Sequence, residues 1–188
     1  MLSDKDIFQA YKEEKIFISP YDPERLQPAS YDVLLSNDFY IFDLHKIDII
    51  DPRLPIKDFM TKVHIEDDGF FVLHPLQFSL GGTFDQIGVD ASHSAEISGK
   101  SSLARLGLII HTTAGFVDPG NDLSVTLELF NCNAIPIKLY PGMKIGQIKF
   151  SRLTSPCERP YGSEGLNSKY YRAESVQPSM MHMNFAAT

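Results

Sequence analysis

Short apolar or alternating runs, broken every few positions by Pro, Gly, Asn and Asp, constrain the fold of this chain more than any other feature. The runs cover residues 31–35, 39–44, 70–73, 77–80, 95–97, 106–110, 123–131, 135–139 and 145–150. Runs of this length are typical of strands, and many of them at close spacing favour a β-sandwich or a β-barrel. We therefore expect an all-β fold.

The run over residues 123–131 predicts the clearest strand. Side chains along a strand alternate between its two faces. The apolar face is expected to carry Leu123, Val125, Leu127 and Leu129. The opposite face is expected to carry Ser124, Thr126 and Glu128. This pattern would present a carboxylate beside a hydroxyl on a rigid element.

The two ends of the chain depart from the strand pattern. Ser3 followed by Asp6 resembles a weak capping box, and the apolar residues behind it recur at helical spacing up to Tyr11. These features predict one short N-terminal helix. Residues 163–188 are richer in small and polar side chains, which favours a C-terminal lid or arm. A length of 188 residues suits a single domain, 1–188.

The net charge indicates which binding partners are unfavourable, and the cysteine spacing indicates whether a metal site or a disulfide is expected. A net charge of −7 disfavours nonspecific binding to nucleic acid or to anionic membranes. The start of the chain is charged, and no stretch reaches the ~20 apolar residues of a membrane-spanning helix. We therefore expect a cytoplasmic protein with no nucleic-acid or membrane partner. Cys132 and Cys157 lack the spacing of a metal site, so we expect free thiols.

Polar groups concentrate in residues 99–128. This segment contains two cations, several hydroxyls, a Gly-containing turn and the carboxylates of Asp118 and Glu128. Such a set can hold a phosphorylated ligand and activate a water molecule against it. Each residue alone is more common as a solvated turn or strand residue. Their joint order is what favours a functional site.

Three well-known motifs do not fit this segment or its surroundings. A P-loop requires Gly at position 94, where this chain has Ser94. A nucleophile elbow requires Gly at position 103, where this chain has Leu103. His64 and Cys157 imitate a zinc deaminase pattern, but Pro160 stands in place of its second Cys. We expect none of these three sites, and we expect His64 to be a solvated surface residue.

Motifs along nearly the whole chain occur in a specific order. They are Gln27–Asp32, Phe71–Pro75, Gly99–Leu108, His111–Gly120, Thr126–Glu128, Pro141–Gln147 and Pro160–Gly162. In this order they resemble the dCTP deaminases of the dUTPase superfamily. The resemblance implies a distorted, jelly-roll-like β-barrel of the dUTPase type. It also implies a homotrimer with three active sites at subunit contacts.

The resemblance assigns the chemistry to Glu128. An enzyme that works without zinc needs a positioned base, because bulk water has a pKa of about 15.7. By similarity, Glu128 takes a proton from water and delivers protons to N3 of cytosine and to the leaving amine. Ser101 and the backbone carbonyl of Ala114 orient the water. Arg105 holds this arrangement through charge-assisted hydrogen bonds.

The resemblance also assigns the nucleotide contacts. Asp118 is expected at the 3′-hydroxyl of the deoxyribose. Thr126, Leu127 and Glu128 form the base-binding segment, with Thr126 and Glu128 facing the base. The expected triphosphate contacts are Lys100, Ser101, Ser102, Gln147, Tyr161 and Lys169. Mg²⁺ is expected to be held mainly through the triphosphate, without protein ligands of its own.

By the same resemblance, Gly115 and Phe116 indicate whether the enzyme forms dUMP or releases dUTP. Bifunctional members of the family share a small glycine at a position where single-activity bacterial members have His-Arg. The related dUTPases use an aspartate like Asp118 to activate the water that attacks the α-phosphate. We therefore predict conversion of dCTP to dUMP, pyrophosphate and ammonia. The alternatives are a single-activity deaminase that releases dUTP and a nucleotide-binding regulator with little turnover. The resemblance also implies inhibition by dTTP in the same pocket.

Two segments differ from the family pattern. The tail has Ala173 where the family has the glutamine that closes over the nucleotide, and Arg172 or Gln177 are candidates to replace it. After Gly120 the chain continues with Asn121 instead of an aromatic residue.

Overall fold

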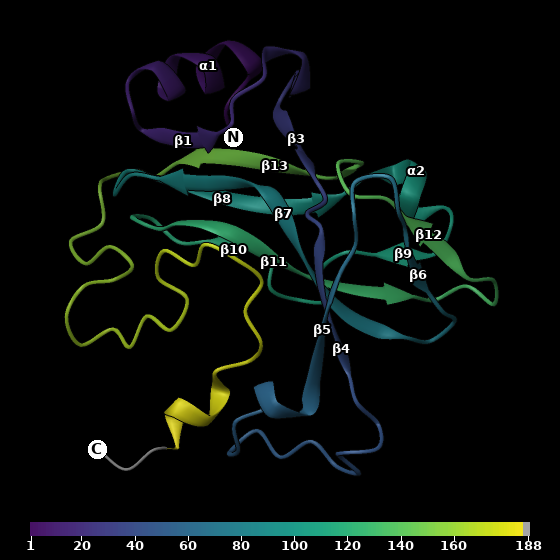
Figure 1. Ribbon diagram of the computed structural model, residues 1–188. Helices are drawn as coiled ribbons and strands as arrows, with labels where there is room; N and C mark the ends of the chain where they lie inside the picture. The colour runs from purple at the N-terminus through teal and green to yellow at the C-terminus, as the bar shows by residue number, and fades with distance from the viewer. Residues whose placement is uncertain (186–188) are drawn as a thin grey trace.

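The computed structural model describes residues 1–185 as two antiparallel sheets with a small third sheet beside them (Figure 1). The first sheet has six strands in the order β5-β4-β7-β11-β9, with β1 also paired to β7. Their bounds are β1 Ile16–Ser19, β4 Asp38–Phe42, β5 Met60–His64, β7 Phe78–Val89, β9 Leu108–Ile109 and β11 Asp122–Asn131. Strands β7 and β11 form the centre of this sheet.

The second sheet has five strands in the order β10-β8-β13-β3-β2. Their bounds are β2 Leu26–Gln27, β3 Ser30–Leu34, β8 His93–Gly99, β10 Phe116–Val117 and β13 Lys144–Arg152. The third sheet pairs β6, Phe71–Leu73, with β12, Ile137–Leu139. The hydrophobic core includes fully buried side chains from both large sheets, among them Leu127 on β11 and Ile148 on β13.

Helices are few and short. The helix α1, Asp4–Lys12, has Ser3 as its N-cap, and the Ser3 hydroxyl accepts a hydrogen bond from the backbone N–H of Asp6. This confirms the predicted N-terminal helix. The other helical segments are α2 Ser101–Ala104, η1 Pro23–Arg25, η2 Lys57–Phe59 and η3 Met181–Asn184. None of the helices within residues 1–185 is long and apolar enough to cross a membrane.

The all-β prediction is confirmed, and within residues 1–185 the strands do not form one closed barrel. Within residues 1–185 the two large sheets form a sandwich-like arrangement, and one isolated bridge links Leu35, which follows β3, to Thr83 on β7. Three of the four end strands of these sheets, β2, β9 and β10, are only two residues long, and the fourth, β5, has five residues. Such short edge strands offer few backbone groups for pairing with the edge of another sheet. The sequence prediction also missed strands β1, β2, β5 and β10.

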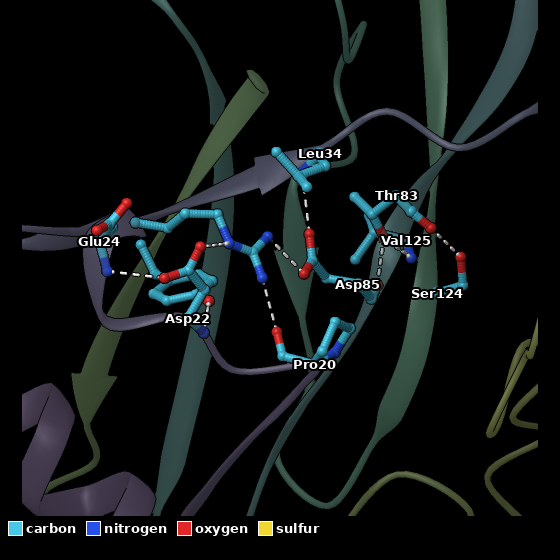
Figure 2. A network of polar contacts seen from close by, with 10 residues as sticks. Pro20, Asp22, Glu24, Leu34, Thr83, Asp85, Ser124 and Val125 are labelled. Carbon is cyan, nitrogen blue, oxygen red and sulfur yellow. Dashed lines mark hydrogen bonds and ion pairs between the residues drawn. The ribbon is translucent and has the colours of Figure 1, made fainter. Parts of the chain in front are cut away.

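A buried polar network ties the second sheet to the first (Figure 2). The guanidinium of Arg25 donates to the Asp85 carboxylate on β7 at 2.6 Å, and both side chains are almost fully buried. The other oxygen of Asp85 accepts from the backbone N–H of Leu34 on β3 at 2.9 Å. The Thr83 hydroxyl donates to the backbone carbonyl of Asp85 at 2.7 Å, and it accepts from the N–H of Val125 on β11 at 2.9 Å. The network therefore fixes β11 against β7.

Candidate active site

A cavity of about 770 Å³ lies against strand β11. Three further segments enclose it: residues 114–118, the loop between β4 and β5, and the C-terminal tail. The predicted site residues that line it are Ala114, Gly115, Phe116, Asp118, Thr126, Glu128 and Tyr161. The tertiary structure thus brings seven separately predicted residues to one cavity.

Glu128 lies on β11 at the wall of this cavity. Its Oε2 atom accepts a hydrogen bond from the backbone N–H of Thr112 at 3.1 Å. Burial raises the pKa of the Glu128 carboxyl, and the Thr112 N–H and the nearby His111 ring partly oppose that shift. A carboxyl with a raised pKa is better suited to accept and return a proton near neutral pH than an exposed one.

Asp118 is a second acidic group on the same cavity and follows β10 directly. Burial raises the pKa of its carboxyl. Within residues 1–185 this carboxyl forms no hydrogen bond or ion pair, so it is available to a ligand. Two carboxyl groups with raised pKa values in one cavity are typical of acid–base sites.

Gly115 lies where two backbones approach closely. Its carbonyl accepts a hydrogen bond from the N–H of Ile97 on β8 at 2.7 Å. A Cβ atom at position 115 would stand only 2.8 Å from the carbonyl oxygen of Ile97. The structure therefore requires glycine here for packing, whatever its effect on the product.

One residue of the predicted polar face of β11, Ser124, is buried. The register with β7 shifts between Ser124 and Thr126, which is a β-bulge. Ser124 lies beside this shift and is buried, and its hydroxyl donates to the backbone carbonyl of Thr83 at 2.6 Å (Figure 2). Thr126 and Glu128 line the cavity as predicted, whereas the Leu127 side chain is fully buried in the core.

The tail covers one side of the cavity. Residues Tyr170, Ala173, Gln177 and Ser179 line it, and the tail runs beside β11 (Figure 1). The Tyr161 hydroxyl accepts a hydrogen bond from the N–H of Tyr170 at 3.2 Å. The tail therefore contacts the rest of the protein through these residues; residues 186–188 of the predicted arm lie outside the described residues.

The other predicted residues do not line this cavity. They are Lys100, Ser101, Ser102, Arg105, Gln147 and Lys169. Ser101, Ser102 and Arg105 are exposed on or beside α2, and within residues 1–185 the Arg105 guanidinium has no ion-pair partner. A single chain therefore holds most of the expected triphosphate contacts away from the expected base, whereas Tyr161 lines the same cavity as Glu128.

Lys100 is already bound to an acidic partner. Its Nζ atom lies 2.6 Å from one oxygen of Asp32, and Lys144 Nζ lies 3.3 Å from the other. The Asp32 side chain is only 3% exposed, so this carboxylate is occupied by the two lysines. Nearby, the Ser30 hydroxyl donates to the Gln147 side-chain oxygen at 3.3 Å.

Sequence reasoning missed two features of the cavity. The first is an apolar wall from the loop between β4 and β5, which includes Ile50, Leu54 and Ile56. Apolar residues in an otherwise polar loop were the available signal, since such residues usually need a surface to pack against. The second is the N–H of Thr112 as a donor to Glu128, which no side-chain pattern could reveal.

The remaining predictions concern metal and thiol chemistry. Within residues 1–185 no three His, Cys, Asp or Glu side chains gather closely enough to hold a metal ion. His64 is exposed as predicted, and its ring nitrogen lies 2.7 Å from the Asp38 carboxylate. Cys132 and Cys157 are free thiols, as predicted.

A family profile and several full-length relatives assign this chain to the same family. A family profile described as dCTP deaminase-like matches residues 1–153. A Nocardioides protein named "dCTP deaminase, dUMP-forming" is 47% identical over 188 residues, which is 100% of this chain and 98% of that protein. A protein of the same name from Corynebacterium jeikeium is 46% identical and covers 98% of each chain. A third, from Thermobifida fusca, is 44% identical over 100% of this chain and 96% of its own.

Among solved structures, the 2′-deoxycytidine 5′-triphosphate deaminase from Agrobacterium tumefaciens is similar with a TM-score of 0.62. The two chains are 22% identical, and the similarity covers 81% of this chain but only 48% of that one. At this identity the likeness shows the fold alone. The profile match and the full-length identity to the three relatives carry the assignment: the chain belongs to the dCTP deaminase-like family.

Proposed function

We propose that this protein deaminates dCTP by hydrolysis, without zinc, and carries the product on to dUMP, pyrophosphate and ammonia. The observation that supports this most directly is the cavity shared by Glu128 and Asp118, two acids with raised pKa values. The relatives at 44–47% identity are named for the same overall reaction.

Glu128 is the acid–base group of the deamination in this proposal. It removes a proton from a water molecule whose oxygen attacks C4 of cytosine, and it passes that proton to N3. The remaining proton of the attacking oxygen then moves through Glu128 to the exocyclic amine, which leaves as ammonia. The N–H of Thr112 fixes one carboxylate oxygen, so the carboxyl keeps its orientation while it accepts and returns protons. The carbonyl of Ala114, on the same cavity, helps to orient the water.

Asp118 serves the second half of the reaction. Its carboxyl has no competing partner among the described residues, so it can contact the deoxyribose and activate a second water against the α-phosphate. Attack there breaks the bond between the α- and β-phosphates and releases pyrophosphate and dUMP. In total, one dCTP and two waters give one dUMP, one pyrophosphate and one ammonia.

The site is completed by a neighbouring copy in a homotrimer. Ser101 and Arg105 belong to the proposed catalytic set, yet they are exposed beside α2 and do not line the cavity of their own chain. Exposed and unpaired polar groups of this kind are suited to a subunit contact. We assign them, with Lys100, Ser102, Gln147 and Lys169, to the triphosphate side of a shared site.

Magnesium fits this donor set as an ion carried by the substrate. Mg²⁺ usually keeps several waters and binds through substrate phosphates, with few protein carboxylates. Asp32, the carboxylate beside Lys100, is occupied by two lysines and is therefore a poor ligand. When bound, the ion would neutralise part of the triphosphate charge next to Lys100. We also propose that dTTP competes for this pocket and that the reaction takes place in the cytoplasm.

The test is product analysis with three purified variants. Wild-type protein, dCTP and Mg²⁺ should give dUMP and pyrophosphate with little dUTP on anion-exchange chromatography. Glu128→Gln should lower ammonia release by about 10²–10⁴-fold. Asp118→Asn should retain part of the deamination and accumulate dUTP. Glu66→Gln, an exposed acid outside the cavity, is the matched control and should behave as wild type.

The outcomes separate the alternatives. Accumulation of dUTP by the wild type would identify a single-activity deaminase, with Asp118 binding only the sugar. Tight dCTP binding without ammonia release would identify a regulator. Full activity of Glu128→Gln would refute the assignment of the base.

A further inference from the structure

Val176 and Pro178 are buried within a tail whose other described residues, 163–185, are exposed or half-buried. Only 4% of the Val176 surface is accessible, and Val176 forms a small apolar cluster separate from the main core. The other members of this cluster are Met60 and Leu80, with Tyr40 and Phe42 packed against them. A residue near the C-terminus thus shares a cluster with strands β4, β5 and β7.

Gly82 on β7 provides the space for this side chain. A Cβ atom at position 82 would lie 2.7 Å from Cγ2 of Val176 and 3.2 Å from Oγ of Ser36. Carbon atoms do not approach this closely without displacement, so any side chain larger than glycine would push Val176 out. Gly82 is paired with Thr126 on β11, which places the notch beside the wall of the cavity.

Hydrogen bonds hold the tail on both sides of Val176. Before it, the carbonyl of Ala173 accepts from the N–H of Ser124 at 2.8 Å. After it, the N–H of Gln177 donates to the hydroxyl of Thr126 at 3.0 Å. Both partners flank the register shift between β11 and β7.

We propose that Val176 is the positioning residue that fastens the tail over the active site, and that the notch at Gly82 is its seat. The seat fixes Gln177 and Ala173 on the cavity wall, and Gln177 takes the place of the missing family glutamine at position 173. The kinetic part of this inference rests on the proposed function, whereas the docking of the tail does not. Because Val176 touches no reacting group, its loss should raise KM for dCTP and leave kcat nearly unchanged.

The proposal can be tested by adding side-chain volume at residue 82 and removing it at residue 176. Gly82→Ala places a methyl group in the notch and should displace the tail. Val176→Ala should weaken the docking because it removes two buried methyl groups. In the double variant the new methyl of residue 82 occupies the space that the valine vacates, so docking should be partly restored. Val89→Ala, the same truncation at a β7 residue with 6% exposure, is the matched control.

Docking is measured first without any nucleotide. Limited trypsin digestion followed by mass spectrometry reports cleavage after Lys169 and Arg172, which requires the tail to leave the surface. Cleavage should be about tenfold faster in each single variant and closer to the wild-type rate in the double variant. Val176→Asp tests the same seat if Gly82→Ala does not fold, because it changes only the tail.

Kinetics provide the second measurement. KM for dCTP should rise by about tenfold in Val176→Ala and Val176→Asp, with kcat within about twofold of wild type. Wild-type cleavage rates in both Val176 variants would refute the proposal that Val176 holds the tail at Gly82. Faster cleavage with unchanged KM would overturn the positioning role. If the wild type itself releases no ammonia, the proposed function fails, while the digestion still decides whether the tail is seated at Gly82.

Discussion

Removing Arg25 alone should destabilise the protein more than removing both members of the buried Arg25–Asp85 pair. The two charged groups lie 2.6 Å apart, and their side chains are 5% and 0% exposed. Arg25 also donates to the carbonyl of Pro20 at 2.6 Å, and Asp85 accepts from the N–H of Leu34 at 2.9 Å (Figure 2). Asp85 therefore depends on Arg25 for its electrostatic compensation, whereas Arg25 Nε also lies 3.7 Å from the Asp22 carboxylate.

The magnitudes follow from what each variant leaves buried. Arg25→Met leaves the Asp85 carboxylate with only the Leu34 N–H as a partner, and breaking a buried pair in this way costs about 3–5 kcal/mol. The double variant Arg25→Met/Asp85→Leu removes the orphaned charge. It leaves the Leu34 N–H unsatisfied instead, at a cost of about 1–3 kcal/mol. The single variant should therefore be less stable than the double variant by about 2 kcal/mol.

Urea denaturation at pH 7 and a fixed protein concentration measures this difference as a shift in midpoint at constant slope. The exposed pair Asp51–Arg53 provides the control, because Arg53 is 67% exposed in its side chain. Arg53→Met should change the free energy of unfolding by less than about 1 kcal/mol. A double variant that is at least as destabilised as Arg25→Met would show that the pair stabilises the fold by itself, and the reasoning would be wrong.

Three further substitutions test the surroundings of the site. Gly115→Ala should cost about 1–3 kcal/mol, because its Cβ would lie 2.8 Å from the Ile97 carbonyl oxygen; an unchanged melting temperature would contradict this. Thr83→Val should cost about 1–3 kcal/mol because it orphans the N–H of Val125, whereas Thr83→Ser keeps the hydroxyl and should be milder in the same urea titration. Burial raises the pKa of the Glu128 carboxyl in the folded state. The folded protein therefore binds the carboxyl proton more tightly than the unfolded chain does. As a result, the free energy of unfolding falls as the pH rises above the usual range of carboxyl pKa values. Glu128→Gln should therefore lose less stability than wild type between pH 4.5 and 7, and identical pH profiles would refute this.

Strand β7 shows where sequence reasoning failed and why. The sequence predicts a strand that stops at Leu80, because the following Gly81 and Gly82 are typical of a turn. The structure continues the strand to Val89. Cβ atoms at these two glycines would lie 2.8 Å from Leu129 and 2.7 Å from Val176, so both are required by close packing within a continuous strand.

Local periodicity was enough for the features that depend on neighbours along the chain. The Ser3 cap and the alternation of β11 from Thr126 onward follow from residues a few positions apart. Helical and strand periods are properties of the local backbone, so the sequence carries them directly. The all-β class could therefore be predicted from local patterns, whereas the roles expected of Glu128 and Asp118 came from the resemblance of the ordered motifs to the family.

Only the tertiary structure decided how these elements meet. It buried Ser124 at a bulge, placed the Thr112 N–H on Glu128, left the α2 residues outside the cavity and seated Val176 beside Gly82. Each of these outcomes depends on a partner that is distant in sequence and on the volume left between packed side chains. A pattern of residue types records which groups are available, whereas close packing determines which of them touch.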